Sequence, residues 1–355
     1  MRIVVTGATG NVGTSVLTAL GRDPHVDSIL GLARRPPQQT SEEARFAKTT
    51  FVGADVTRDD LVPHLRGADC VIHLAWLIQP SRDRAALWQT NVEGSQRVFS
   101  AVAEAGVPAL VLASSLGVYS PGPQPDGKKE RVDESWPREG VPTSWYAQHK
   151  AEVERRLDLF EREQPDTRVV RLRPALVMKR SAAEEVRRLF FGPFLPSALV
   201  KPGRLPLVPH IPGAVVQVVH SLDVGEAYAR AATRDVEGAF NIAAEPELDG
   251  RRLAEAIGAR AVPIPAKVAR ALADATWRLR LHPTSPDWLD LALGVPLLDS
   301  SRARAELDWQ PRWTSEETAR ELLTGLAERA AGPTPPLRRG DRTHEIRSGV
   351  GREQL

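Results

Sequence analysis

Three glycines close behind the first predicted strand constrain the fold of this chain more than any other feature. The strand Arg2–Thr6 runs into Gly7-Ala8-Thr9-Gly10-Asn11-Val12-Gly13, and the helical pattern Val12–Leu20 follows at once. Glycines in such a turn let the backbone bend tightly and approach a pyrophosphate, while the helix N-terminus offers free N–H groups to phosphates. A turn that serves packing alone is the alternative. We expect a dinucleotide to be bound by Gly7, Thr9, Gly10, Asn11, Val12 and Gly13.

Short apolar runs alternate with longer amphipathic ones over the first two-thirds of the chain. The expected strands are Arg2–Thr6, Ser28–Ala33, Thr50–Val52, Cys70–Leu74, Ala109–Ala113 and Arg168–Leu172. The expected helices are Val12–Leu20, Arg82–Ala105 and Ser144–Glu163. Continuous apolar strands are typical of a sheet covered on both faces, and strands that alternate with helices form parallel crossovers. The pattern predicts an α/β protein with a doubly wound, Rossmann-like parallel sheet and a smaller C-terminal substrate lobe.

The alternation loosens after about residue 175, so we expect a dinucleotide-binding domain over residues 1–175. A strand near 215–220, Val215–His220, is expected to complete its sheet. Residues 176–330 are expected to form the substrate-binding lobe. Its further predicted elements are a strand at Ala239–Ala243 and helices at Arg251–Ile257, Ala266–Arg278 and Ser315–Arg329.

Two segments lack a regular pattern. Prolines are too dense between Phe191 and Gly213 for a helix, which predicts a long loop, either beside the site or on the surface. Residues 331–355 are rich in Pro, Gly and Arg with few apolar side chains, and we expect them to be disordered.

Charge and cysteine content exclude several classes of protein. Lys and Arg number 47 against 45 Asp and Glu, a formal net charge of +2, whereas nucleic-acid binders concentrate basic charge. The single cysteine, Cys70, cannot form an intramolecular disulfide. The sequence shows neither a signal peptide at its start nor an apolar stretch of about 18 residues. We expect a cytoplasmic protein whose partner is a small-molecule substrate, not nucleic acid or membrane.

The end of the second predicted strand indicates the nicotinamide cofactor. NAD-specific sites place Asp or Glu about 20 residues beyond the glycines, where it binds the ribose hydroxyls. Here the strand ends Ala33-Arg34-Arg35. Because a guanidinium forms paired, charge-assisted hydrogen bonds to a phosphate, Arg34 favours NADP. NAD is the alternative, in which both arginines are only surface charges.

Tyr146 and Lys150 stand four residues apart in a predicted helix and share one face of it. A free tyrosine, with a pKa of about 10, is a poor base at pH 7. A neighbouring ammonium and an oxidised nicotinamide are expected to lower that pKa into the working range. Ser115 follows an apolar strand, at the end where ligands of α/β sheets bind. We expect Tyr146 to move a proton and Ser115 to hydrogen-bond the substrate, while Ser114 caps the strand.

Together these motifs resemble the extended short-chain dehydrogenase/reductase family, the NAD(P)-dependent epimerase/dehydratase-like proteins, from Met1 to about Ala330. The agreeing motifs are the glycine loop, Gly53-Ala54-Asp55-Val56, His73-Leu74-Ala75, Asn91-Val92-Glu93-Gly94, Ser115 before Tyr119, Tyr146 with Lys150, Arg173-Pro174 and Leu298–Trp309. The resemblance implies that Asp55 and Val56 hold the adenine and that Lys150 binds the nicotinamide ribose. It also implies cofactor contacts from Leu74, Ala75, Asn91, Tyr146, Pro174 and Val177, and a catalytic set of Ser115, Tyr146 and Lys150.

The chain departs from this family at three places. After Arg173-Pro174 the family often shows Tyr-Gly-Pro, whereas this chain has Met178-Lys179-Arg180. Dehydratases of the family follow the active-site Ser or Thr with an Asp-Glu pair, whereas this chain has Leu116-Gly117, so we expect no dehydration. Trp76-Leu77-Ile78 indicates either a partly apolar substrate pocket or packing under the proline-rich loop. The predicted function is NAD(P)-dependent hydride transfer to or from a carbonyl or secondary alcohol. The alternatives are a nucleotide-sugar epimerase with tightly bound NAD and a non-catalytic dinucleotide-sensing regulator.

The last expectations concern histidines and assembly. His73 ends a strand and is expected to be buried and structural, whereas His149 is expected to be exposed. The histidines lack Cys or carboxylate partners at metal-ligand spacing, so we expect no metal. The apolar residues Leu87, Val92, Val98 and Val102 exceed what one sheet contact requires and predict a homodimer through paired helices.

Overall fold

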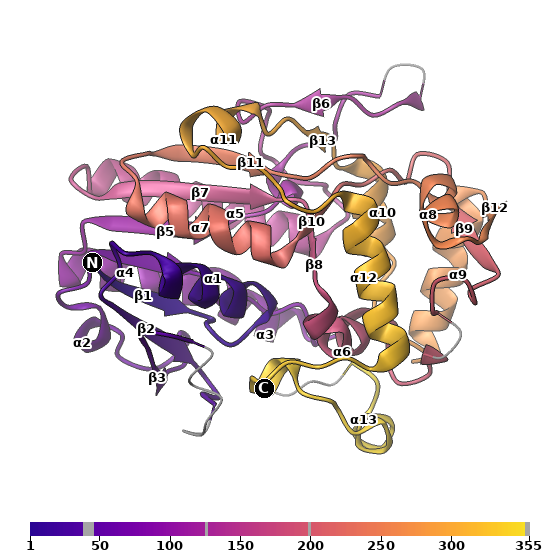
Figure 1. Ribbon diagram of the computed structural model, residues 1–355, viewed down its shortest axis with the longest axis horizontal. Coiled ribbons are helices and arrows are strands. Elements are labelled where there is room, and N and C mark those ends of the chain that lie inside the picture. The colour runs from indigo at the N-terminus through magenta and orange to yellow at the C-terminus, as the bar shows by residue number, and fades with distance from the viewer. Residues whose placement is uncertain (38–45, 125–126, 198–199, 352–355) are drawn as a thin grey trace.

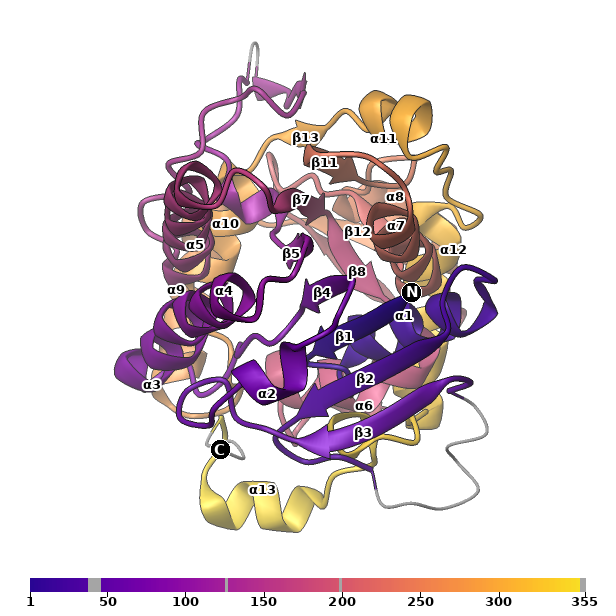
Figure 2. The same cartoon turned by 90° about the vertical axis from the view of Figure 1, so that its left-hand side faces the viewer.

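A seven-stranded parallel sheet forms the centre of the protein, a computed structural model that describes residues 1–37, 46–124, 127–197 and 200–351 (Figure 1). Its strands, in spatial order, are β11 (Gly238–Ile242), β7 (Arg168–Pro174), β5 (Ala109–Ala113), β4 (Cys70–His73), β1 (Arg2–Thr6), β2 (Ser28–Ala33) and β3 (Thr49–Gly53). Helices cover both faces of the sheet, as Figure 2 shows. The predicted doubly wound α/β fold is confirmed.

The helices follow the strands in the expected order. They are α1 (Asn11–Arg22), α2 (Val62–Leu65), α3 (Arg84–Trp88), α4 (Gly94–Ala105), α5 (Trp145–Glu163), α6 (Ala183–Val186), α7 (Ser221–Thr233), α8 (Gly250–Ile257), α9 (Ala266–Arg278), α10 (Asp287–Gly294), α11 (Ser301–Glu306), α12 (Ser315–Glu328) and α13 (Arg342–Ser348). None of the helices within the described ranges combines the length and apolar character that crossing a bilayer requires.

The central strands are apolar throughout because both their faces are buried. Neighbouring residues of β1 point to opposite sides: Val5 joins the core under α1 and α7, whereas Val4 joins the core under α4 and α5. Continuous apolar sequence at such strands is the signature of a sheet between two helical layers. The carboxyl ends of β1, β4 and β5 consequently lie side by side, and they position the site described below.

The strand that completes the sheet beside β7 is not the one that the sequence predicted. Val218–His220 forms β10, which pairs with β8 (Leu176–Met178) outside the main sheet. The edge of β7 is instead occupied by β11, from Gly238 beside Val170 to Ile242 beside Pro174. The prediction for Val215–His220 is therefore wrong, because β11 already satisfies the hydrogen bonds at that edge.

Two smaller strand pairs lie in the second half of the chain. β9 (Leu207–His210) pairs with β12 (Arg260–Pro263), so the proline-rich segment ends in a strand and is not a loop throughout. β13 (Leu297–Leu298) pairs with β6 (Arg131–Val132).

The long helix predicted at Arg82–Ala105 is interrupted. Its first part, α3, begins at Arg84, and the Asp83 carboxylate caps it by accepting a hydrogen bond from the Ala86 N–H. A π-helical turn at Gln89–Glu93 separates α3 from α4. The four apolar residues that predicted a dimer are wholly buried within the protomer: Leu87, Val92, Val98 and Val102. Because these four side chains are not exposed, they cannot contact a second protomer and do not support a homodimer.

The C-terminal segment packs on the body of the protein, unlike the disorder expected from its composition. Leu337 is buried, and the Thr334 hydroxyl donates to the Thr9 carbonyl oxygen in the glycine loop at 2.6 Å. On α13, Glu345 accepts two hydrogen bonds from the buried Arg187 guanidinium, at 2.6 and 3.0 Å. Residues 352–355 lie outside the described ranges.

Replacing Leu337 by Ala should loosen this segment. Leu337 is 1% exposed, so its truncation removes about 2 kcal/mol or more of packing, which corresponds to at least roughly tenfold faster amide exchange over residues 332–351. Ile346→Ala is the control, because Ile346 is 49% exposed on α13. Hydrogen–deuterium exchange with mass spectrometry measures both, and unchanged exchange in Leu337→Ala would contradict the packing.

Candidate active site

The glycine loop joins β1 to α1 and lies against the end of β4. Gly7 has a φ of +69°, and a Cβ there would stand 2.7 Å from the Ala75 backbone nitrogen. A Cβ at Gly13 would stand 2.4 Å from the Gly7 carbonyl oxygen, which is the close helix–strand approach that the motif requires. Leu74 and Ala75, both predicted to line the cofactor, are thus brought beside the glycine loop.

Gly10 differs from these two because packing does not require it. A Cβ there would meet only the Gly7 oxygen, at 3.7 Å, and no side chain caps the N-terminus of α1 that begins at Asn11. A bare backbone beside an uncapped helix N-terminus fits the pyrophosphate of a dinucleotide. Val12 and the buried Thr9 belong to the same turn, and the Asn11 side chain donates to the Val177 carbonyl oxygen at 3.1 Å.

A buried lysine beneath the loop was missed by the sequence analysis. The Lys179 ammonium donates to the Asn11 carbonyl oxygen and to the hydroxyls of Thr14 and Ser15, at 2.7, 2.7 and 2.9 Å. Burial lowers the pKa of Lys179 to about 8, and the Glu185 and Glu321 carboxylates oppose this. Its position in Met178-Lys179-Arg180, where the family often has Tyr-Gly-Pro, was the available signal.

The ends of β2 and β3 lie on the far side of β1 from β4 and β5. Arg34 is exposed there and lies near Asp55. Burial raises the pKa of Asp55, but hydrogen bonds from Thr57 and the charges of Arg34 and Arg58 outweigh it, so that pKa lies below its usual value. Val56 is buried beside Gly94.

Ser115, Tyr146 and Lys150 come together at the end of β5. The Ser115 hydroxyl accepts a hydrogen bond from the Gly117 N–H at 3.1 Å and is also hydrogen-bonded to Tyr146. The Ser144 hydroxyl caps α5, so Tyr146 and Lys150 lie in its first two turns. The buried Lys150 ammonium donates to the Ala113 carbonyl oxygen at 2.6 Å and lies 6.0 Å from the Tyr146 ring centre.

The pKa of Tyr146 lies above its usual value. Burial raises it, and the hydrogen bond from Ser115 only partly opposes that effect. Burial also lowers the pKa of Lys150 to about 7, against the attraction of Glu154, so the lysine carries less charge than an exposed one. Without the nicotinamide, burial thus outweighs the effects that lower the Tyr146 pKa. The lowering expected from Lys150 together with an oxidised nicotinamide stays a prediction.

Glu154, one turn beyond Lys150, organises the polar groups behind the site. Its buried carboxylate accepts two hydrogen bonds from Arg173, at 2.6 and 2.9 Å, and one from Ser114 at 2.5 Å. Ser114 therefore binds Glu154 and does not simply cap its strand. The sequence analysis missed Glu154, although its i, i+4 spacing from Lys150 places both on one helix face.

Four other residues named in the sequence analysis have structural partners. The side-chain amide of Asn91 binds both the N–H and the carbonyl oxygen of Leu77, at 2.7 and 2.9 Å. His73 is hydrogen-bonded to Thr6 and Ser95, and burial lowers its pKa to about 3, so it is a neutral structural histidine as predicted. His149 is only 6% exposed, because Trp88 and Trp145 contact its ring; the prediction that it is exposed is wrong. Pro174 ends β7 beside Ile242.

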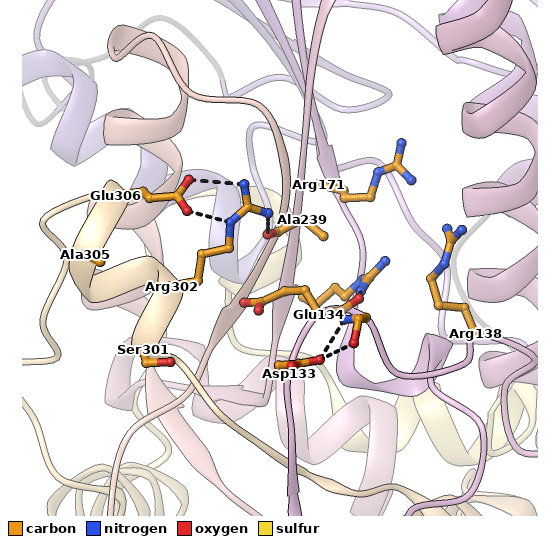
Figure 3. Close-up of a pocket in the computed structure, with 11 residues that line it drawn as sticks. Asp133, Glu134, Arg138, Arg171, Ala239, Ser301, Arg302, Ala305 and Glu306 are labelled. Atoms are coloured by element: carbon orange, nitrogen blue, oxygen red, sulfur yellow. Dashed lines mark hydrogen bonds and ion pairs between the residues drawn. The ribbon is translucent and has the colours of Figure 1, made fainter.

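Figure 3 shows a separate pocket of about 850 Å³ between the edge of the sheet and α11. Its arginines already face acidic groups: Arg302 faces Glu306, Arg173 faces Glu154, and Arg138 and Arg171 face Asp158. None of Ser115, Tyr146 and Lys150 lines it. This pocket is therefore distinct from the group of Ser115, Tyr146 and Lys150 at the end of β5.

Comparisons with known proteins agree with this geometry. An uncharacterized protein of Mycobacterium tuberculosis is 30% identical over 332 residues, which are 93% of this chain but 30% of that protein. A second protein of the same species is 27% identical over 358 residues, 99% of this chain and 88% of that protein. The L-arabinose 1-dehydrogenase (NAD(P)(+)) of Haloferax volcanii is 30% identical over 118 residues, 33% of this chain and 42% of that protein.

Solved structures share the fold. UDP-glucose 4-epimerase of Thermus thermophilus, in complex with NAD, aligns with a TM-score of 0.65 and 22% identity over 92% of this chain and 99% of that one. The UDP-glucose-4-epimerase of Stenotrophomonas maltophila, with bound NAD and formylated UDP-arabinopyranose, aligns with a TM-score of 0.68 and 20% identity over 93% and 98%.

A family match spans the site itself. The matching family is the NAD dependent epimerase/dehydratase family, over residues 3–243. That range contains the glycine loop, Ser115, Tyr146 and Lys150. The chain therefore belongs to the NAD dependent epimerase/dehydratase family.

Proposed function

We propose that the protein transfers a hydride between NADP(H) and a carbonyl or secondary alcohol. The observation that carries this proposal is the grouping of Ser115, Tyr146 and Lys150 at the end of β5. The end of β4, whose Ala75 contacts Gly7 of the glycine loop, is its neighbour in the sheet. A parallel sheet binds ligands at this edge. In this proposal residues 1–175 bind the cofactor, and residues 176–330 provide the substrate lobe.

Each residue of the group has a distinct role in the proposed reaction. Tyr146 keeps its proton in the buried site, so it is the general acid that protonates a carbonyl oxygen during reduction and the base in the reverse direction. Ser115 hydrogen-bonds the same oxygen and polarises it. Lys150 holds the nicotinamide ribose. A bound nicotinamide supplies or accepts the hydride.

The structure also supports the absence of dehydratase chemistry in this proposal. A Cβ at Gly117 would stand 3.1 Å from Cε1 of Tyr146, so any side chain at that position would require the tyrosine ring to shift by a few tenths of an ångström. Leu116 is buried in the core. The two positions that carry acids in the dehydratases therefore serve packing here.

The cofactor proposed is NADP, with NAD as the alternative. Arg34 is exposed at the end of β2, where it can reach a 2′-phosphate, while Asp55 and Val56 bind the adenine at the end of β3. Ala33 brings no negative charge against that phosphate.

A nucleotide-sugar epimerase is the second candidate, favoured by the solved UDP-glucose 4-epimerases of the same fold. Such an enzyme keeps its NAD, because the hydride returns to the same substrate. Chromatography of the nucleotides released when the purified protein is denatured separates the two. Stoichiometric NAD favours the epimerase, and absence of retained nucleotide favours the reductase.

Tyr146→Phe removes the proton donor and leaves the ring. We expect turnover to fall by about 10²–10⁴-fold, the usual contribution of general acid–base catalysis. The Kd for NADPH, measured by fluorescence titration, should change little and serves as the control. Turnover near that of the natural protein would exclude Tyr146 as the acid.

Arg34→Ala tests the cofactor. Loss of charge-assisted bonds to the 2′-phosphate should weaken NADPH binding by at least about tenfold, or 1.4 kcal/mol, with NADH binding nearly unchanged. Arg35→Ala is the matched control and should keep the preference for NADPH. Equal loss of both cofactors in Arg34→Ala, or a natural protein that prefers NADH, would make Arg34 a surface charge.

The homodimer is proposed through the outer face of α5, where Leu159 is 51% exposed. Light scattering at micromolar concentration should give a mass near twice 38.8 kDa. Leu159→Glu should halve that mass, whereas Leu279→Glu, at a leucine 70% exposed beyond α9, should not. A natural protein of monomer mass would refute the dimer.

A further inference from the structure

Tyr146, the proposed acid, is contacted by three tryptophans, and Phe190 contacts one of them. We call these five side chains the aromatic cluster: Trp76, Trp145, Tyr146, Phe190 and Trp288. They come from the end of β4, from α5, from the turn after α6 and from α10. The Trp288 ring lies 5.0 Å from that of Tyr146 at a 37° tilt, and Trp76 meets Tyr146 edge-on at 5.9 Å. Phe190 meets Trp288 edge-on at 5.0 Å. These separations are those of stable aromatic pairs.

Four of the rings keep part of their surface accessible. Trp76, Tyr146, Phe190 and Trp288 are partly buried, and only Trp145 lies fully in the core. The accessible surface of this cluster is therefore aromatic and adjoins the Tyr146 side chain.

Several polar atoms of the same region are buried without a hydrogen-bond partner. The indole N–H groups of Trp76, Trp145 and Trp288 are among them, as are the Ser285 hydroxyl and Oδ2 of Asp287 at the start of α10. Buried polar atoms normally have partners, so these atoms are the least satisfied polar groups in and beside the aromatic cluster.

Three arginines that adjoin the aromatic cluster in sequence or in space are already engaged. Arg187 is held by Glu184 and Glu345, and Arg188 donates to the carbonyl oxygens of Pro336 and Arg338. Arg84 faces Asp287 at 3.7 Å. The diphosphate of a nucleotide sugar would have to displace one of these contacts before an arginine could bind it, whereas a neutral aromatic molecule would not.

We propose that the substrate is an aromatic ketone or aldehyde, or the corresponding alcohol, whose ring packs against Trp76 and Trp288. The proposal rests on the proposed function and names its substrate class. In reduction, the carbonyl carbon takes a hydride from NADPH and its oxygen takes the proton of Tyr146. The products are the alcohol and NADP⁺, and a solvent proton restores the phenol.

The test compares three probes on the natural protein with NADPH: acetophenone, cyclohexyl methyl ketone and UDP-glucose. Saturation-transfer NMR in the presence of NADP⁺ measures binding, and loss of NADPH absorbance measures turnover. We expect binding and reduction of acetophenone, with kcat/KM at least tenfold above that of the cyclohexyl ketone of similar size, and no competition from UDP-glucose.

Variants locate the effect in the aromatic cluster. Trp288→Leu keeps an apolar side chain but removes the ring, so the tenfold preference for acetophenone should disappear while NADPH binding is unchanged. Trp277→Ala is the control, because that indole packs against Arg82 and not against Tyr146. If Trp288→Leu does not fold, Phe190→Leu provides the same comparison.

The outcomes separate the two proposals. Acetophenone that binds but is not reduced retains the substrate class and refutes hydride transfer to it. UDP-glucose that binds or reacts in preference to both ketones overturns the substrate class. Equal use of the two ketones, or an unchanged ratio in Trp288→Leu, also overturns it.

Discussion

The ion pair between Glu154 and Arg173 is the interaction on which the active-site end of the sheet depends. It ties α5, which carries Tyr146 and Lys150, to β7, and Ser114 extends it to β5. Burial alone would raise the pKa of Glu154, but Arg173, Arg171 and Ser114 lower it to about 2. The stabilisation is thus complete above the ordinary carboxyl pKa and is lost as the pH falls toward about 2.

The end of β4 connects the glycine loop with the aromatic cluster. Ala75 fits against Gly7, and the next residue, Trp76, places its indole 3.5 Å from the Lys150 ammonium and edge-on to Tyr146. A cation against an indole face is stabilised by the ring quadrupole, most strongly where water is excluded. Trp76 therefore helps to keep a buried lysine in place while its ring also packs edge-on with Tyr146.

The sequence predicts the strands and turns that local patterns determine. It does not predict contacts between segments that are distant in the sequence. β1, β2 and β5 end where their apolar runs end, and the glycine spacing predicts the loop. Val218–His220 pairs with β8 because β11 occupies the edge of β7. The local sequence of either strand does not indicate which of them pairs with β7. Trp288 meets Tyr146, and Phe190 meets Trp288, across long stretches of intervening sequence. His149 is buried by tryptophans of two helices, although its helical position alone predicts exposure.

The hydrogen bond from Thr334 to Thr9 spans 325 residues of sequence. During translation the glycine loop leaves the ribosome first, at a time when the residue that binds its carbonyl oxygen has not been made. Domains fold as they emerge, so the N-terminal sheet can form while this contact is still missing. The nascent chain thus passes through a stage in which its glycine loop has been synthesised but the Thr9 carbonyl oxygen still lacks the hydrogen bond from Thr334.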